Sequence, residues 1–182
     1  MADQYLTFFL AEEEYAVGIL QVREILELCP ITRLPATPAH VRGVINVRGS
    51  VVPVIDLAVK IGLAETQVTR RTCVVIVEVA WEEGTKVLGI LVDAVHQVIE
   101  LTADAIEAPP SFGTQIHPSY LRGMARAEAK FVMLLDLDRL LTAAEIAAVE
   151  PAGGAGAESA ETAEAAAWVG EGFPAAAAAE AP

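Results

Sequence analysis

The sequence predicts a mainly β protein whose body is built from two similar halves. Short apolar runs, rich in β-branched and aromatic residues, alternate with polar or proline-containing turns along most of the chain. An Arg-Gly pair precedes an Asp-Leu pair by 14 positions twice, first at Arg42 and Asp56 and again at Arg122 and Asp136. We therefore expect a duplicated unit that forms two small barrel-like subdomains of about five strands each.

The first half opens with two predicted strands, at 4–10 and 14–20, which are separated by a polar Ala-Glu-Glu-Glu turn. Apolar residues then recur at positions i, i+3, i+6 and i+7, which predicts one or two helical turns. These residues are Ile19, Val22, Ile25 and Leu26. The connector 29–38 carries three prolines, which exclude a continuous helix and a central strand there.

Residues 43–57 form a predicted hairpin whose turn is Arg48-Gly49. Gly49 tolerates a positive φ and Asn46 can bond the turn backbone, so the turn should push Arg48 outward from a rigid base. An arginine presented in this way is either a docking anchor or a solvated turn residue. Pro53 lacks an N–H, so we expect its strand to lie at a sheet edge there or to be bulged.

The second half repeats this pattern with loops of different length. A polar Trp-Glu-Glu-Gly turn joins its first two strands, and a proline-containing loop precedes its hairpin. The expected elements are strands at 72–80, 85–95 and 96–101, a loop at 105–119, a hairpin at 120–137 and a helix at 143–150.

The composition changes sharply near residue 150. Residues 151–182 are mostly Ala, Gly, Glu and Pro without a hydrophobic period, and such a segment buries too little surface to offset its ordering entropy. We expect a folded domain at 1–150 and a disordered tail at 151–182. The apolar island Trp-Val-Gly-Glu-Gly-Phe at 168–173 is either linker drift or a short docking motif.

Charge and hydrophobicity exclude several classes of partner. The formal net charge is −13, and residues 1–149 carry twelve basic and nineteen acidic residues, a net charge of −7. No basic cluster is longer than Arg70-Arg71, which disfavours binding to nucleic acid or to an anionic membrane. The apolar runs are much shorter than the ~20 residues of a membrane-spanning helix, and no secretory signal is visible. We expect no nucleic-acid partner and no direct membrane insertion.

The sequence gives little indication of catalysis or metal binding. The three histidines lack metal-ligand spacing, and no Cys-x-x-Cys motif is present. The two cysteines are far apart and fit a reducing cytosol. No nucleophile elbow, phosphate loop or dinucleotide motif appears. We therefore expect a protein without enzyme activity, cofactor or metal.

One pair of acids is the exception to consider. Asp136 and Asp138 are two positions apart and would share one face of a strand, as paired acids of a hydrolase do. They also lie where the strand gives way to a helix, and capping is the structural alternative. Asp56 precedes a similar short segment and is assigned the same capping role.

Four segments together closely resemble the CheW-type chemotaxis coupling proteins. They are YLTFFLAEEEYAVGILQVREIL, ITRLPATPAHVRGVINVRGSVVPVIDL, LGILVDAVHQVI and YLRGMARAEAKFVMLLDLDRLL, and the match runs from about Tyr5 to Leu141. The resemblance implies two intertwined five-stranded SH3-like β-barrel subdomains with short helices. It also implies a cytoplasmic, non-enzymatic adaptor, peripheral to the inner membrane through receptor complexes.

The resemblance also implies two partners. One is the cytoplasmic hairpin tip of a methyl-accepting chemoreceptor, and the other is the regulatory domain of a CheA-type histidine kinase. A related coupler in a non-chemotactic pathway, such as surface motility or second-messenger control, is the alternative.

Candidate binding residues follow from the same resemblance. For the receptor they are Arg48, Glu24, Ile19, Val22, Val51, Leu88 and Gly89. For the kinase they are Ile31, Leu34, Val41, Arg42 and Gly43. Three of these, Val22, Leu34 and Val41, could equally be core residues, and Gly43 could serve only a turn.

Overall fold

The computed structural model describes residues 1–109 and 116–141, and in this part of the chain the backbone is mainly β-strand. The strands are β1 (Ala2–Leu10), β2 (Glu13–Gly18), β3 (Val22–Glu27), β4 (Val41–Val47), β5 (Ser50–Asp56), β6 (Cys73–Trp81), β7 (Gly84–Val92), β8 (Ala94–Thr102), β9 (Ile106–Glu107), β10 (Leu121–Ala127) and β11 (Lys130–Leu135). The helical elements are α1 (Leu57–Lys60), α2 (Leu137–Leu140) and the 3₁₀ turns η1 (Ile19–Gln21), η2 (Ala103–Ala105) and η3 (Pro118–Tyr120).

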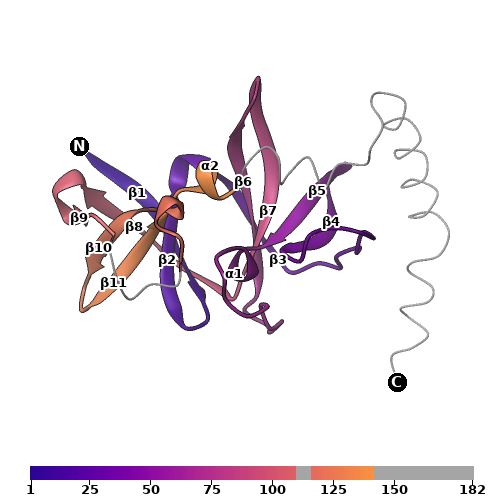
Figure 1. Cartoon of the computed structure of the whole chain (residues 1–182), viewed down its shortest axis with the longest axis horizontal. Helices are drawn as coiled ribbons and strands as arrows, with labels where there is room; N and C mark the ends of the chain where they lie inside the picture. The colour runs from indigo at the N-terminus through magenta and orange to yellow at the C-terminus, as the bar shows by residue number, and fades with distance from the viewer. Residues whose placement is uncertain (110–115, 142–182) are drawn as a thin grey trace. The chain divides into compact units, whose positions relative to one another are not determined.

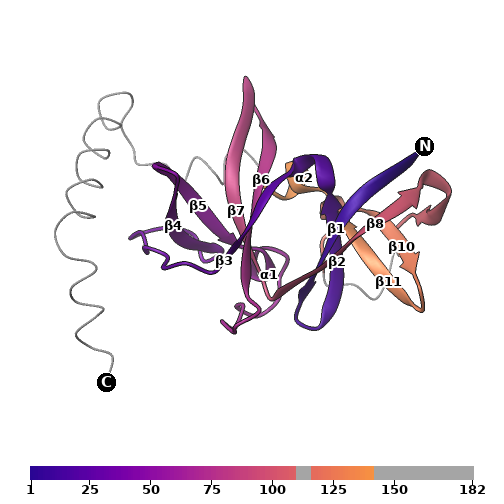
Figure 2. The same cartoon turned by 180° about the vertical axis from the view of Figure 1, so that it is seen from behind.

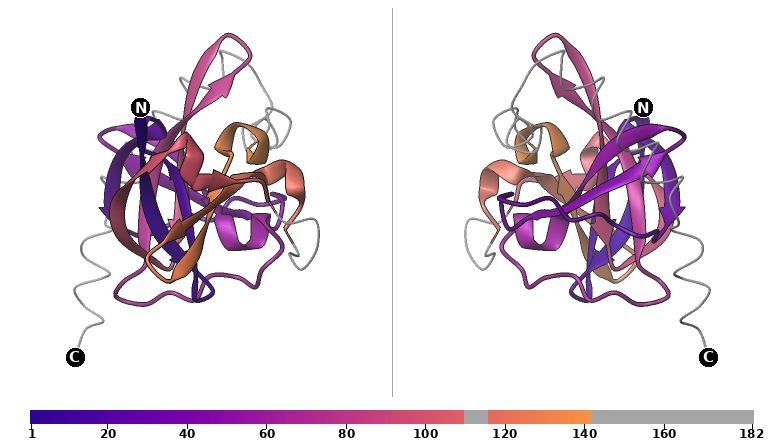
Figure 3. Two further views of the ribbon diagram at one scale, coloured as in Figure 1. Left: turned by 90° about the vertical axis from the view of Figure 1, so that its left-hand side faces the viewer. Right: turned by 90° about the vertical axis from the view of Figure 1, so that its right-hand side faces the viewer.

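The strands form two sheets that exchange segments of the chain. Sheet A has the order β8-β1-β2-β11-β10-β9, and sheet B has the order β3-β6-β7-β5-β4. The chain leaves sheet A after β2, contributes β3 to β7 to sheet B, and returns along β8 (Figures 1 and 2; end-on views in Figure 3). The predicted pair of intertwined β subdomains is confirmed. Sheet A has a sixth strand because the two-residue β9 pairs with β10.

The internal repeat predicted from the sequence is visible in strand register. The β4–β5 pairing shifts between Val41 and Gly43, and the β10–β11 pairing shifts between Leu121 and Gly123, 80 positions later. Both hairpins lead directly into a four-residue helix, α1 or α2. The duplication therefore extends to the β-bulge, a feature that bends and twists a strand locally.

The glycines of the two Arg-Gly pairs are required by close backbone contacts. A Cβ on Gly43 would lie 2.1 Å from the carbonyl oxygen of Thr32, which pairs with Val44 as an isolated bridge. A Cβ on Gly123 would lie 2.8 Å from the carbonyl oxygen of Glu107 in β9. In each half, the bulged strand thus accepts a neighbouring segment at a distance that only glycine allows.

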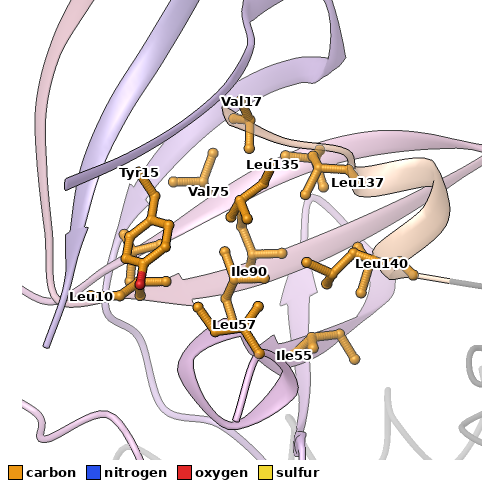
Figure 4. Close-up of a cluster of buried hydrophobic side chains, with 14 of the residues drawn as sticks. Leu10, Tyr15, Val17, Ile55, Leu57, Val75, Ile90, Leu135, Leu137 and Leu140 are labelled. Carbon is orange, nitrogen blue, oxygen red and sulfur yellow. The ribbon is translucent and has the colours of Figure 1, made fainter. Parts of the chain in front are cut away.

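The largest hydrophobic core lies between the two sheets (Figure 4). It joins side chains of β1 and β2 to side chains of β5, β6, β7 and both α-helices. Its fully buried members include Leu10, Tyr15, Leu57, Ile90 and Leu137. Each such side chain contributes roughly 1.5–3 kcal/mol of burial free energy. A smaller cluster packs on the other face of each sheet, so it is the core between the sheets that holds the two halves as one folded unit.

The helical turns predicted from Ile19 to Leu26 are wrong beyond the first turn. η1 ends at Gln21, and β3 then pairs with β6 as an edge strand in which more and less exposed residues alternate. A single 3₁₀ turn already places Ile19 and Val22 on the same side, because its period is three residues. The spacing of Ile19 and Val22, followed by Ile25 and Leu26, is therefore compatible with a 3₁₀ turn followed by a strand.

Pro53 lies where β5 is locally a sheet edge, as predicted. β5 as a whole lies between β7 and β4, but its residues up to Pro53 pair with β4 alone. Val44, opposite Pro53, directs its N–H and carbonyl to Thr32 instead, and the ladder with β7 starts only at Val54. The missing N–H of Pro53 therefore removes no ladder hydrogen bond.

Three predictions lie outside the described residues: the helix at 143–150, the domain boundary at 150, and the disordered tail at 151–182 with its 168–173 island. Within the described residues, no helix is long and apolar enough to cross a membrane.

Candidate functional site

The β4–β5 turn presents Arg48 to solvent on a well-defined backbone. Arg48 has a φ of 51° and Gly49 a φ of 86°, the paired positive values of a tight type I′ hairpin. The Gly49 N–H donates to Asn46 Oδ1 at 2.9 Å, which fixes the turn from within. The Arg48 side chain is 82% exposed. The structure thus agrees with the prediction that this turn pushes Arg48 outward.

Arg48 forms an ion pair with Glu24, the other charged residue expected at the receptor site. Arg48 Nη2 donates to Glu24 Oε2 at 2.9 Å, and the Glu24 side chain is 24% exposed. Glu24 lies on β3 and Arg48 follows β4, and these two strands are the opposite edges of sheet B. The contact between them shows that sheet B curls until its edges approach each other, as in an open barrel.

The apolar residues expected beside this pair differ in how much surface they offer. Val51 is 56% exposed on β5, and Ile19 and Val22 are partly buried against the core between the sheets. Leu88 is fully buried in that core and has no surface to offer a partner, which corrects its assignment to a groove lining. Gly89 is also buried, and a Cβ there would lie 2.8 Å from Val74 Cγ1, so it permits close strand packing inside sheet B.

The other half of the molecule carries no copy of this ion pair. Eighty positions after Arg48, Glu128 occupies the β10–β11 turn with the same positive φ, 56°. Seventy-three positions after Glu24, the offset between β3 and β8, lies Gln97. The charge at the turn is reversed and the edge carboxylate is lost. The two halves therefore share a backbone but present chemically different turns.

Arg42, expected at the kinase surface, is held inside the protein. Its side chain is 14% exposed; Nε lies 3.3 Å from Asp56 Oδ2, and Nη2 donates to the Thr66 carbonyl at 2.8 Å. It also pairs with Glu65. Most of its guanidinium donors thus have partners within sheet B and the 62–68 segment, so the structure gives Arg42 an internal bracing role.

Asp56 completes this network and corrects its predicted capping role. It occupies the N-cap position of α1, but its side chain makes no capping hydrogen bond. Instead, its carboxylate accepts from Thr66 N at 3.0 Å and from Thr66 Oγ1 at 2.9 Å. A fully buried carboxylate needs such partners, because leaving it unpaired would cost several kcal/mol. The network therefore ties the 62–68 segment to the β4–β5 hairpin.

Of the remaining kinase candidates, only Ile31 lines a surface hollow. A hollow of about 260 Å³ is lined by Leu28, Cys29, Pro30, Ile31, Arg33, Arg42, Val68 and Leu91. Ile31 is partly buried there, whereas Leu34 packs against the core between the sheets. Val41 is a core residue and has little surface to offer, and Gly43 is buried by its contact with Thr32. Of this group, Ile31 and Leu34 keep partly exposed side chains.

The paired acids do not share a cleft. Asp136 caps α2 by accepting from Arg139 N at 3.2 Å, as predicted. Asp138 points elsewhere, and its Oδ1 accepts from Ala80 N at 2.8 Å and from Gln21 Nε2 at 3.1 Å. Within residues 1–109 and 116–141, no cluster of three or more His, Cys, Asp or Glu side chains is arranged to hold a metal ion.

Two features of the surface were missed from the sequence. Leu20, in η1, is 97% exposed although its neighbour Ile19 packs against the core between the sheets. Arg33 lines the hollow beside Ile31. Interpreting residues 14–20 as a strand hid the exposure of Leu20, because the strand pattern gives no sign that the chain leaves the strand at Gly18 and enters a 3₁₀ turn. Sequence has no signal for Arg33 beyond its position between two prolines.

The fold defines a class of protein: two β-sheets that exchange strands and share one hydrophobic core. The family model described as CheW-like domain matches residues 4–145. The chain therefore belongs to the CheW-like family.

Individual relatives agree with this assignment. The chain is 35% identical over 150 residues to the chemotaxis protein CheW of Klebsiella aerogenes, covering 82% of this chain and 88% of that protein. It is 28% identical over 150 residues to the protein FrzA of Myxococcus xanthus, covering 81% and 90%. The crystal structure of the scaffolding protein TtCheW from Thermoanaerobacter tengcongensis matches with a TM-score of 0.71 and 33% identity, covering 80% of this chain and 91% of that chain.

Proposed function

We propose that this chain is a non-enzymatic adaptor that couples transmembrane chemoreceptors to a CheA-type histidine autokinase. Membership of the CheW-like family and similarity to a chemotaxis protein and a scaffolding protein support this function. In this proposal the protein is cytoplasmic and reaches the inner membrane through the receptor complex. The observation that carries the proposal is the ion pair of Arg48 with Glu24, which joins the two edges of sheet B.

The receptor surface is centred on this ion pair. Glu24 restrains the guanidinium, so Arg48 loses less side-chain entropy on binding than a free arginine would. Val51 and the exposed edges of Ile19 and Val22 supply the apolar area beside it. This combination, an ordered arginine beside apolar contacts, is typical of the energetic centre of an interface. The buried Leu88 and Gly89 support the framework beneath.

The kinase surface is centred on Ile31 and Leu34, at the connector that follows β3. The hollow beside Ile31 is a recess into which an apolar side chain of the kinase regulatory domain would fit. Arg33 adds a cation at its rim. The Arg42–Asp56–Thr66 network and the close contact at Gly43 keep the connector and the β4–β5 hairpin in fixed positions.

Coupling follows from carrying both surfaces on one sheet. Glu24 and the connector are separated by only a few residues, and both are fixed to sheet B. Binding of one partner raises the effective concentration of the other without any new contact between them. A receptor that changes its fit to the Arg48 surface then biases the kinase by a coupling free energy of typically about 1–3 kcal/mol.

The experiment is a binding measurement on purified proteins. We expect the wild-type chain to bind a soluble receptor cytoplasmic-hairpin fragment and a CheA-type kinase regulatory domain. Arg48→Ala should weaken only the binding of the receptor fragment, and Ile31→Asp should weaken only the binding of the kinase domain. Because the Arg48 side chain is largely exposed, its thermal midpoint should stay near that of the wild type. Equal losses of binding and stability in Arg48→Ala would contradict a docking role.

A second candidate is a coupler for a chemosensory pathway other than chemotaxis. The similarity to the protein FrzA, over 81% of this chain, favours keeping this candidate. The same two surfaces would serve, with a different receptor and kinase. Capture from the native organism, followed by identification of the kinase recovered, separates the two candidates.

A further inference from the structure

Leu20 is an apolar side chain held almost entirely in solvent by an ordered turn. It is the middle residue of η1, and its neighbour Ile19 packs against the core between the sheets. Successive side chains of a 3₁₀ turn point about 120° apart. Ile19 and Val22 can therefore anchor the turn while Leu20 points away from the core. A singly exposed leucine has no meaning by itself, so what holds this turn in place decides its interpretation.

Asp138 holds the turn in place from the other sheet. One of its carboxylate oxygens, Oδ1, accepts from Gln21 Nε2 at 3.1 Å and from Ala80 N at 2.8 Å. The ladder between β3 and β6 ends at Val22 and Val77, so Ala80 N lies beyond its last pair. A residue of α2, which follows the last strand of sheet A, thus joins η1 to β6 of sheet B.

The hydrogen bonds from Gln21 and Ala80 to Asp138, called the brace below, are charge-assisted. Such hydrogen bonds are shorter and stronger than neutral ones. The effect of the brace on η1 is geometric: the turn has only three residues and one internal backbone hydrogen bond, from Val22 N to Ile19 O. Without Gln21 fixed at one end, such a short turn would sample other conformations. With it, Leu20 is presented in one orientation next to Ile19 and Val22.

We propose that Leu20 is a contact residue for the receptor hairpin tip and that Asp138 is the residue that positions it. This inference rests on the proposed function and extends the receptor surface along η1, which is continuous with Val22 and Glu24 of β3. The occupant is an apolar side chain of the receptor hairpin, which covers Leu20 on docking. An ordered apolar contact binds more tightly than a mobile one because less entropy is lost.

The test measures binding of a soluble receptor cytoplasmic-hairpin fragment to the full chain and to variants. Leu20→Ala should weaken binding about tenfold, since it removes most of a buried leucine's contribution. Asp138→Ala should weaken it several-fold, and Asp138→Asn should retain binding because an acceptor oxygen remains. Gln21→Ala removes the other end of the brace. It replaces Asp138→Ala in the test if Asp138→Ala does not fold.

The matched control is Asp136→Ala, two positions before Asp138, which removes the cap of α2 and the ion pair of Asp136 with Arg139 but none of the contacts of Gln21 or Ala80. It should lower thermal stability, because losing an N-cap costs about 1 kcal/mol, and leave receptor affinity within about twofold. Amide exchange at residues 20–22 should rise in Asp138→Ala and not in Asp136→Ala. A merely stabilising role for Asp138 would predict the same exchange in both.

A double-mutant cycle gives the decisive result. If Asp138 acts through the turn that carries Leu20, then Asp138→Ala should add little to the loss already caused by Leu20→Ala. Wild-type affinity in Leu20→Ala, or equal affinity losses in Asp138→Ala and Asp136→Ala, would overturn the inference while leaving the adaptor function intact. No binding of the fragment by the wild type would overturn the proposed function and this inference with it.

Discussion

Replacing Arg42 with Ala should unfold the protein at a markedly lower denaturant concentration. The substitution removes the ion pair with Asp56, the hydrogen bond to the Thr66 carbonyl and the pair with Glu65. Asp56 is fully buried and would keep only the two donors of Thr66. Removing one partner of a buried pair costs about 3–5 kcal/mol. Because Arg42 keeps some exposure, we expect about 3 kcal/mol.

The assay is urea unfolding followed by circular dichroism, with Arg48→Ala as the control. The Arg48 side chain is 82% exposed and its partner Glu24 is 24% exposed, and ion pairs open to solvent are worth about 0–1 kcal/mol. For a folded unit of this size, a loss of 3 kcal/mol corresponds to a fall of roughly 10 °C in the thermal midpoint. An Arg42→Ala protein within about 0.5 kcal/mol of the wild type would refute the bracing role and return Arg42 to the docking candidates.

Three further predictions follow from the structure. Gly43→Ala should destabilise the fold strongly, because its φ is 144° and a Cβ would lie 2.1 Å from the carbonyl oxygen of Thr32. Gly18→Ala is the control and should cost little stability, because a Cβ there meets no atom within 4 Å. Urea unfolding compares the stability of the two variants. Burial, and secondarily the charge of the nearby Glu13, raises the pKa of Tyr15 from 10.0 to about 12. The unfolded chain therefore releases this proton first, so stability should be unaffected below about pH 10 and should fall as the pH rises toward 12 in an alkaline unfolding series. In a double-mutant cycle, Arg48→Ala and Glu24→Ala should be non-additive in receptor affinity, and simple additivity would contradict a joint site.

The architecture was predictable because the sequence contains an internal repeat. The Arg-Gly and Asp-Leu pairs at equal spacing reported a repeated hairpin, and the structure places a bulge at both Arg-Gly positions. The exchange of strands was not predictable from the pattern. The apolar pattern predicted β8 as a strand and β3 as helical turns. It carries no information on which sheet each segment joins, and only the resemblance implied that the two subdomains are intertwined.

The candidate site was predictable where a residue's position alone fixed its environment. Arg48 is exposed because a two-residue turn leaves its side chain no other direction. Arg42 and Asp56 could not be assigned correctly, because the partner of both, Thr66, lies in a loop whose path no local pattern specifies. Leu88 was assigned to the receptor surface from the family resemblance alone, whereas the structure buries both faces of β7 where Leu88 lies.

The most direct test of the adaptor role is co-sedimentation of a CheA-type kinase with receptor-containing membranes. The chain is added over a range of concentrations, as wild type or as Arg48→Ala. The account predicts that wild-type chain increases the kinase retained on the membranes, and that excess chain lowers it again because separate copies occupy receptor and kinase. The Arg48→Ala variant should still bind the kinase in solution but should retain little of it on the membranes. Kinase retention that is the same with and without the wild-type chain would contradict the account.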